Sequence, residues 1–117
     1  MSDGEVSDAD VLLAVREGAL TQVADLTSDL EQMMAASESS NADDEHEPEG
    51  ATIAFERAQV GALLAQARQR LNDVEHALGL LKNGTYGRCA RCGGPIGAER
   101  LAARPAGRTC IGCAGRG

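Results

Sequence analysis

Apolar side chains recur at helical spacing along the first third of the chain. One seam has an apolar residue at every seventh position and four residues beyond two of these: Leu12, Ala19, Leu26, Met33, Val23 and Leu30. This period places all of them on one face of a helix. Ser7 precedes the seam and Asp10 follows three residues later, as in a capping box. A helix is therefore predicted from near Ser7 to about Ala36.

A second and clearer seam follows in the middle of the chain. Its apolar residues recur every seven positions, with leucines four residues after three of them: Ile53, Val60, Ala67, Val74, Leu81, Leu64, Leu71 and Leu78. Asn83 and Gly84 then provide a helix stop. Between the seams, residues at about 37–51 lose periodicity and become Ser, Asn, Asp and Glu with one Pro, a composition typical of a loop.

Together these patterns predict a long antiparallel helical hairpin of coiled-coil type. Two CxxC pairs, Cys89 with Cys92 and Cys110 with Cys113, follow it and predict a small four-cysteine zinc finger at the end of a mainly α fold. The expected organisation is a disordered N-terminus at 1–6, a hairpin over 7–83 with its tip loop at about 37–51, a finger over 84–113 and a disordered tail at 114–117. Because the hairpin satisfies its own seam, we expect a monomer. No apolar run approaches the length of a membrane span, so we expect no membrane partner.

Composition and charge refine this picture. The chain of 117 residues has one Phe, one Tyr and no Trp, so it cannot build a large aromatic core and needs help from a metal or from helix pairing. The net charge of −7 is unevenly spread. Residues 1–51 hold fourteen acids against one base, whereas residues 84–117 hold one acid against six arginines. One end of the chain is acidic and the zinc end is basic, which favours a protein partner over direct DNA binding.

Four cysteines carry the strongest chemical signal. Cys89 and Cys92 form one CxxC pair, Cys110 and Cys113 form another, and seventeen residues separate the pairs. Four thiolates in this arrangement are what tetrahedral zinc requires. Two disulfides, iron or a redox CxxC are the alternatives, but the acidic N-terminus has no apolar signal segment, which favours a reducing cytoplasm. We therefore expect one structural zinc and a cytoplasmic protein.

No nucleophile, base and orienting group occur at catalytic spacing, and four cysteine ligands leave zinc without an open coordination position. We therefore expect that the protein is not an enzyme. The acidic run around His46 is a second candidate site, because crowded carboxylates can bind a hard cation or meet a basic protein surface. A solvated charge run is the competing interpretation of the same residues.

Around the cysteines, the chain resembles the DksA/TraR family of C4-type zinc-finger transcription regulators. The resemblance rests on the run from Gly84 to Gly93, on Ile96, Arg100, Leu101, Ala103 and Pro105, and on Cys110 to Cys113. It implies a regulator that binds bacterial RNA polymerase in its secondary channel and places an acidic hairpin tip near the active-site magnesium. It also implies ppGpp as a candidate small-molecule partner.

The resemblance further implies which tip residues face the polymerase. The family's Asp-x-x-Asp-x-Ala pattern falls on His46, Glu49 and Ala51, so that histidine replaces the first acid while the second carboxylate and the alanine are kept. Neighbouring acids supply other carboxylates for this role, among them Asp43, Asp44 and Glu45. The rival hypothesis is a zinc-ribbon module whose basic end binds nucleic acid or another protein partner directly. A third is a redox protein with labile zinc.

Overall fold

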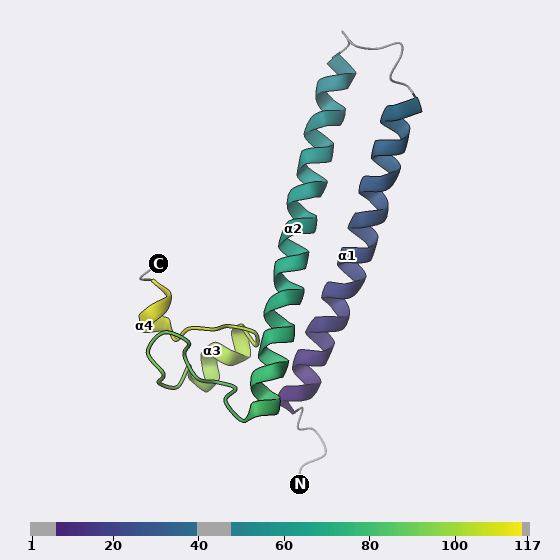
Figure 1. Cartoon of the computed structure of the whole chain (residues 1–117). Coiled ribbons are helices and arrows are strands. Elements are labelled where there is room, and N and C mark those ends of the chain that lie inside the picture. The colour runs from purple at the N-terminus through teal and green to yellow at the C-terminus, as the bar shows by residue number, and fades with distance from the viewer. Residues whose placement is uncertain (1–6, 40–47, 116–117) are drawn as a thin grey trace. The chain divides into compact units, whose positions relative to one another are not determined.

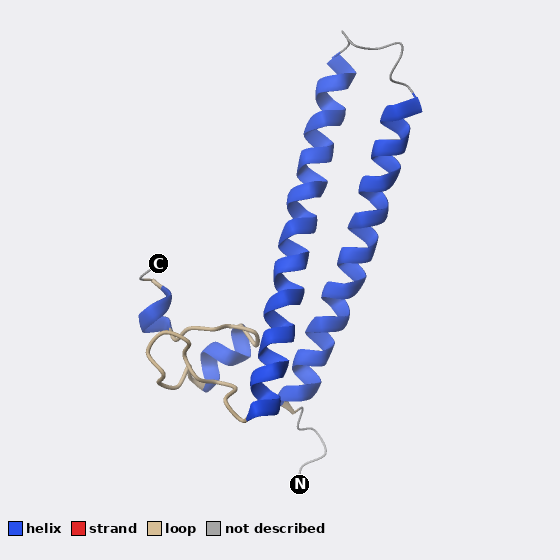
Figure 2. Cartoon of the chain, viewed as in Figure 1, coloured by secondary structure: helices blue, strands red, loops and turns tan. Residues whose placement is uncertain are grey.

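The computed structural model describes residues 7–39 and 48–115, and within these ranges the protein is mainly helical (Figures 1 and 2). The helices are α1 (Asp8–Ser39), α2 (Pro48–Asn83), α3 (Ala98–Ala103) and α4 (Ile111–Ala114). The described residues contain no strand, and their isolated β-bridge joins Arg88 and Pro95. The predicted fold class, a helical hairpin followed by a four-cysteine finger, is confirmed.

Both predicted helix-end signals are found. At the start of α1 the Ser7 hydroxyl accepts the backbone N–H of Asp10 at 3.1 Å, and the Ser7 carbonyl accepts that of Val11 at 3.1 Å. These bonds satisfy amides that have no partner within the helix. At the end of α2, Gly84 adopts φ +80° and the N–H of Thr85 donates to the carbonyl of Leu80 at 2.9 Å. A glycine in this left-handed conformation ends the helix without a steric penalty.

The helices run further into the predicted loop at 37–51 than the sequence pattern indicates. Helix α1 continues to Ser39 instead of ending at about Ala36, and α2 already begins at Pro48. Proline suits the first helical position because it lacks an N–H that would have no partner there. The Ser, Glu and Gly residues at these ends are compatible with helix when a neighbouring apolar seam extends it. Residues 40–47 lie outside the described residues.

The described chain falls into two compact units, each containing an antiparallel pair of segments from α1 and α2. One unit comprises Met1–Gly18 and Arg70–Gly117, and the other comprises Ala19–Gln69. In the first unit, the core consists of Leu12 and Val74, which are fully buried, and Ala77. Partly buried side chains pack against this core from both helices and from the finger: Val15, Leu71, Leu78, Leu81, Tyr86 and Ala106.

In the second unit, burial along the seam is uneven. Leu64 and Ala67 are buried as predicted, but Ile53 remains 39% exposed although it is a seam position. Ile53 and Met33 instead line a shallow groove between the two helices. Two helices without a third element bury only a narrow stripe, so side chains at its border stay partly in water. Within the described residues, no helix combines the length and apolar character needed to cross a membrane.

Candidate zinc centre

The structure brings all four cysteine sulfurs together. The Sγ atoms of Cys89, Cys92, Cys110 and Cys113 all lie within 4.8 Å of one another, and those of Cys92 and Cys110 are 3.8 Å apart. Zinc–sulfur bonds of about 2.3 Å in a tetrahedron require sulfurs about 3.8 Å apart, so the spacing fits a single zinc ion. Cys89 is buried and Cys92 is exposed, while the other two are partly buried.

The first pair lies in a turn that its own backbone closes. The N–H of Cys89 donates to the carbonyl of Gly94 at 2.7 Å, and the N–H of Gly93 donates back to the carbonyl of Cys89 at 2.9 Å. Gly93 has φ +75°, a conformation that glycine adopts without strain. The bridge between Arg88 and Pro95 borders this turn. The predicted tight turn after Cys92 is therefore present.

Backbone N–H groups also point at the sulfurs of this first pair. The Cys89 sulfur accepts from the N–H groups of Arg91 and Cys92, each at 3.4 Å. The Cys92 sulfur accepts from the N–H of Gly94 at 3.4 Å. Hydrogen bonds to a thiolate stabilise its negative charge and orient it as a metal ligand. The turn thus presents two oriented sulfurs.

The negative charges of the clustered thiolates require a cation to compensate them. The backbone N–H groups of Cys92 and Cys110 lower the pKa of the Cys89 thiol to about 6. The pKa of Cys113 is raised to about 12, first by its hydrogen bond to the Cys110 sulfur and then by burial. Sulfurs so close together cannot all ionise unless a positive ion compensates their charge. The donor set and the geometry are those of a C4-type zinc finger with one structural zinc.

Specific contacts hold the finger together and attach it to α2. The hydroxyl of Tyr86 donates to the carbonyl of Pro105 within the finger at 2.7 Å, and the guanidinium of Arg108 pairs with the Asp73 carboxylate of α2 at 2.8 Å. The Ala90 N–H also donates to the carbonyl of Arg108 at 2.7 Å, which ties the two arms of the finger together. These bonds give the cysteine pairs a fixed support.

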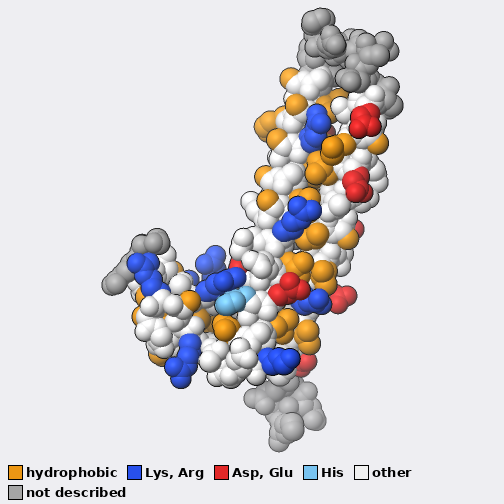
Figure 3. Space-filling model, viewed as in Figure 1, with side chains coloured by type: hydrophobic (Ala, Val, Ile, Leu, Met, Phe, Trp, Pro, Cys, Tyr) orange, Lys and Arg blue, Asp and Glu red, His pale blue; other side chains and the backbone are white. Residues whose placement is uncertain are grey.

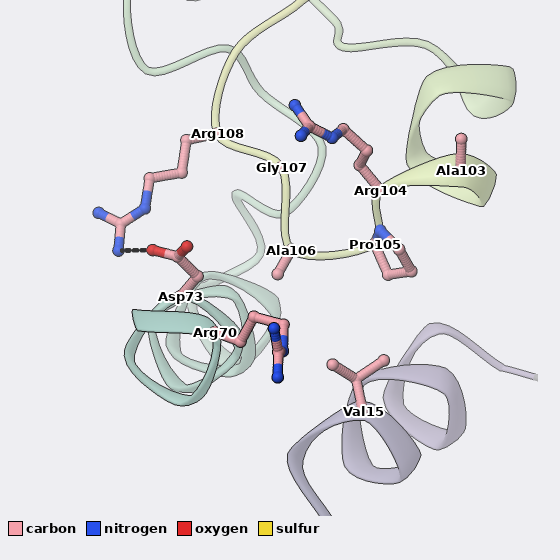
Figure 4. A pocket seen from close by; sticks show the side chains of 9 residues that line it. All are labelled: Val15, Arg70, Asp73, Ala103, Arg104, Pro105, Ala106, Gly107 and Arg108. Atoms are coloured by element: carbon pink, nitrogen blue, oxygen red, sulfur yellow. Dashed lines mark hydrogen bonds and ion pairs between the residues drawn. The ribbon is translucent and has the colours of Figure 1, made fainter. Parts of the chain in front are cut away.

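A cavity lies where the finger loop meets α1 and α2 in this unit, and arginines are among the residues that line it (Figure 4). The cavity has a volume of about 420 Å³ and is lined by the side chains of Arg70, Arg104 and Arg108, with Asp73 paired to the last. On the face drawn in Figure 3, Lys and Arg side chains gather over the finger and the adjoining end of α2. Arg70 and Asp73 were not predicted as site residues, because only the folded finger brings them beside Arg104.

Of the predicted tip residues, Glu49 and Ala51 lie within the described part of the chain. Asp43, Asp44, Glu45 and His46 lie outside the described residues. Glu49 lies in the first turn of α2, and Ala51 follows in the same helix with an exposed side chain. The assignment of these residues to the surface that faces the polymerase therefore stays a prediction.

Comparison with known proteins identifies the finger. Residues 84–116 match the family described as prokaryotic dksA/traR C4-type zinc finger. The uncharacterized protein YteA of Bacillus subtilis (strain 168) is 42% identical over 66 residues, which are 56% of this chain and 28% of YteA. The uncharacterized protein YlyA of the same organism is 38% identical over 56 residues, or 48% of this chain and 45% of YlyA. The chain thus spans between a quarter and a half of these two relatives.

A solved structure extends the likeness beyond the finger. The transcription factor DksA2 from Pseudomonas aeruginosa shares the fold with a TM-score of 0.54 and 28% sequence identity. The alignment covers 90% of this chain and 81% of the DksA2 chain. The predicted resemblance to DksA/TraR zinc-finger proteins is confirmed, both in the finger and in the hairpin before it.

Proposed function

Because the chain carries a dksA/traR zinc finger on a DksA-like fold, we propose that it is a non-enzymatic transcription regulator that binds bacterial RNA polymerase. The single observation that carries this proposal is the likeness to the DksA2 transcription factor over 90% of the chain. We further propose that the hairpin enters the secondary channel and places its acidic tip near the active-site magnesium. The candidate tip residues are Asp43, Asp44, Glu45, His46, Glu49 and Ala51.

The sequence supports this orientation through its charge distribution. Residues 43–49 hold five carboxylates, whereas residues 84–117 have a net positive charge. A cation at the end of a channel attracts the acidic tip, and acidic groups at its rim attract the arginines of the finger. Both attractions favour the same direction of entry. We assign Glu49, which follows the family pattern, to the magnesium end.

We assign the structural zinc to Cys89, Cys92, Cys110 and Cys113. When bound, the ion compensates the thiolate charges and holds the two arms of the finger together. Cys89 and Cys92 hold it from one turn, and Cys110 and Cys113 hold it from the start and the middle of α4. A finger fixed in this way keeps Tyr86 on Pro105 and Arg108 on Asp73 of α2.

The arginine-lined cavity supports ppGpp as a candidate partner. Arg70 and Arg104 provide guanidinium groups that match phosphate oxygens in charge and geometry. Asp73 neutralises Arg108 in the same cavity, so the local positive charge is lower than the number of arginines indicates. We propose that a phosphate-rich ligand would bind here rather than at the acidic tip.

Binding to purified core RNA polymerase tests the proposed function. The zinc-loaded chain should bind saturably, a protein known to occupy the secondary channel should displace it, and ppGpp should be tested in a parallel series.

Glu49→Ala should leave the affinity for polymerase within about threefold of the wild type and reduce the effect on transcription, because a tip carboxylate acts beyond the docking surface. Gln59→Ala, an exposed change in the same helix, is the matched control. Absence of binding at tens of micromolar, or DNA binding without polymerase, would refute the proposal.

A further inference from the structure

The two cysteine pairs of the finger differ in how their backbone is held. Residues 87–96 form a turn with three internal backbone hydrogen bonds, two of which make the β-bridge between Arg88 and Pro95, and none of the three involves a metal. By contrast, Cys110 precedes the four-residue helix α4, whose N-terminus has no side-chain cap. Within α4 the N–H groups of Cys113 and Ala114 donate to the carbonyl of Cys110, at 3.1 and 2.9 Å. These bonds are local to the segment.

The second arm is anchored only up to its first cysteine. Arg100 donates its Nε–H to the carbonyl of Thr109 at 2.8 Å, and the carbonyl of Arg108 accepts from Ala90 at 2.7 Å. Beyond Thr109, the hydrogen bonds that join 110–115 to the rest of the described finger involve the cysteine sulfurs. Ile111 in this segment is 78% exposed and adds little packing. The segment is thus held by the metal and by sulfur contacts.

The hydrogen bonds that reach the sulfurs also differ between the two cysteine pairs. Three backbone N–H···S bonds at 3.4 Å reach the first pair, two at Cys89 and one at Cys92. The backbone N–H of Cys110 also bonds to the Cys89 sulfur, and among the described residues no backbone N–H is found donating to the sulfur of Cys110 or Cys113. The turn therefore orients the sulfurs of the first pair, whereas the backbone gives the sulfurs of the second pair no such support.

We infer that the centre consists of two unequal half-sites: Cys89 and Cys92 are a preformed turn that retains the zinc, and Cys110–Gly115 is a clasp that opens first. Opening would free the Cys110 and Cys113 sulfurs from the ion, with water taking the vacated positions, and would expose these sulfurs to electrophiles while Cys89 and Cys92 would keep the ion. This inference rests on the zinc assignment proposed above. It makes the clasp the electrophile-sensitive part of the finger.

Mapping of alkylation on the zinc-loaded full chain tests the inference. With substoichiometric N-ethylmaleimide, the thiolate sulfur adds to the double bond, an S–C bond forms and the neighbouring carbon takes a proton from water. Peptide mass spectrometry should find Cys110 and Cys113 modified at least threefold faster than Cys92. Because Cys92 is the exposed cysteine of the four, control by simple accessibility predicts the opposite order. Fastest modification of Cys92 or Cys89 would overturn the inference.

Cobalt binding separates this inference from the zinc assignment. The wild-type chain should bind one Co²⁺ with thiolate charge-transfer absorption, and its absence would refute the assignment itself. Cys113→Ser should still bind Co²⁺, with reduced affinity because one of the four ligands is replaced. Cys89→Ser should lower the Co²⁺ affinity at least tenfold further. If the wild-type chain binds Co²⁺ but the two variants lose the same amount of Co²⁺ affinity, the zinc assignment stands and the unequal half-sites are refuted.

Discussion

Tyr86 shows how one residue joins the finger to the hairpin segments of its unit. Its ring packs against the cluster of Leu12, Val74 and Ala77, while its hydroxyl donates to the carbonyl of Pro105 at 2.7 Å. This combination satisfies both the apolar body and the polar end of a tyrosine. Burial raises the pKa of the Tyr86 hydroxyl above 10.0, and the carboxylate of Asp8 raises it further.

Titration of Tyr86 provides a prediction at this scale. Because the folded pKa is raised, the stabilisation is complete below pH 10.0 and is lost as the pH rises through the folded value. Tyr86 is the single tyrosine in a chain without tryptophan, so phenolate absorbance reports on it alone. The folded protein should titrate at higher pH than the same chain in denaturant. Coincident curves would contradict the account, and Tyr86→Phe supplies the blank.

The residue scale also shows what the sequence could predict. The spacing of the four cysteines and the glycine after Cys92 were enough to predict the sulfur cluster, because a CxxC turn is a local structure. Tyr86 and Ile96 were expected as a small core of the finger, and Ile96 is buried there. That Tyr86 also packs against Leu12 depends on a contact between residues far apart in the chain, which no local pattern contains.

Among the secondary-structure elements, α1 contains a glycine that its surroundings do not require. A Cβ added at Gly18 would meet no atom within 4 Å, and the residue lies inside the helix. Glycine at such a position costs helix stability because it loses more backbone entropy than alanine. In the finger, by contrast, Gly87 has φ +90° and its added Cβ would lie 3.5 Å from the Leu101 side chain.

Two substitutions test this difference. Gly18→Ala should raise the free energy of unfolding by about 0.5–1 kcal/mol, which is the intrinsic gain of alanine in a helix. Gly87→Ala should lower it by about 1–2 kcal/mol, because a Cβ is disfavoured in the left-handed region. Urea unfolding of the zinc-loaded protein measures both. A loss of stability in Gly18→Ala would indicate that the helix there needs a conformation only glycine provides.

The elements also show why sequence patterns place helix ends imprecisely. The seams predicted both long helices and the stop at Gly84, but they missed the helical turns at Ser37–Ser39 and Pro48–Gly50. Those turns contain no large apolar residue, so a hydrophobic period contains no information about them. Similarly, Ile53 follows the period of its seam and is still 39% exposed.

At the scale of the whole molecule, we propose that separate regions of one chain perform separate tasks. The finger is built from zinc ligands and contacts to α2, and its cavity collects arginines. The tip concentrates carboxylates by sequence. The proposed action depends on delivering the tip to a partner's active site. The predicted domain boundaries at 7–83 and 84–113 follow this division and stay a prediction.

Local cleavage from the polymerase active site directly tests whether the tip of the chain lies there. Fe²⁺ can replace the catalytic magnesium of core RNA polymerase and generate hydroxyl radicals that cut only nearby protein backbone. The zinc-loaded chain, labelled at one end and bound to that enzyme, should be cleaved within residues 43–51, and excess Mg²⁺ should suppress the cuts. Cleavage confined to the finger, or an uncut chain under saturating binding, would contradict the proposed orientation.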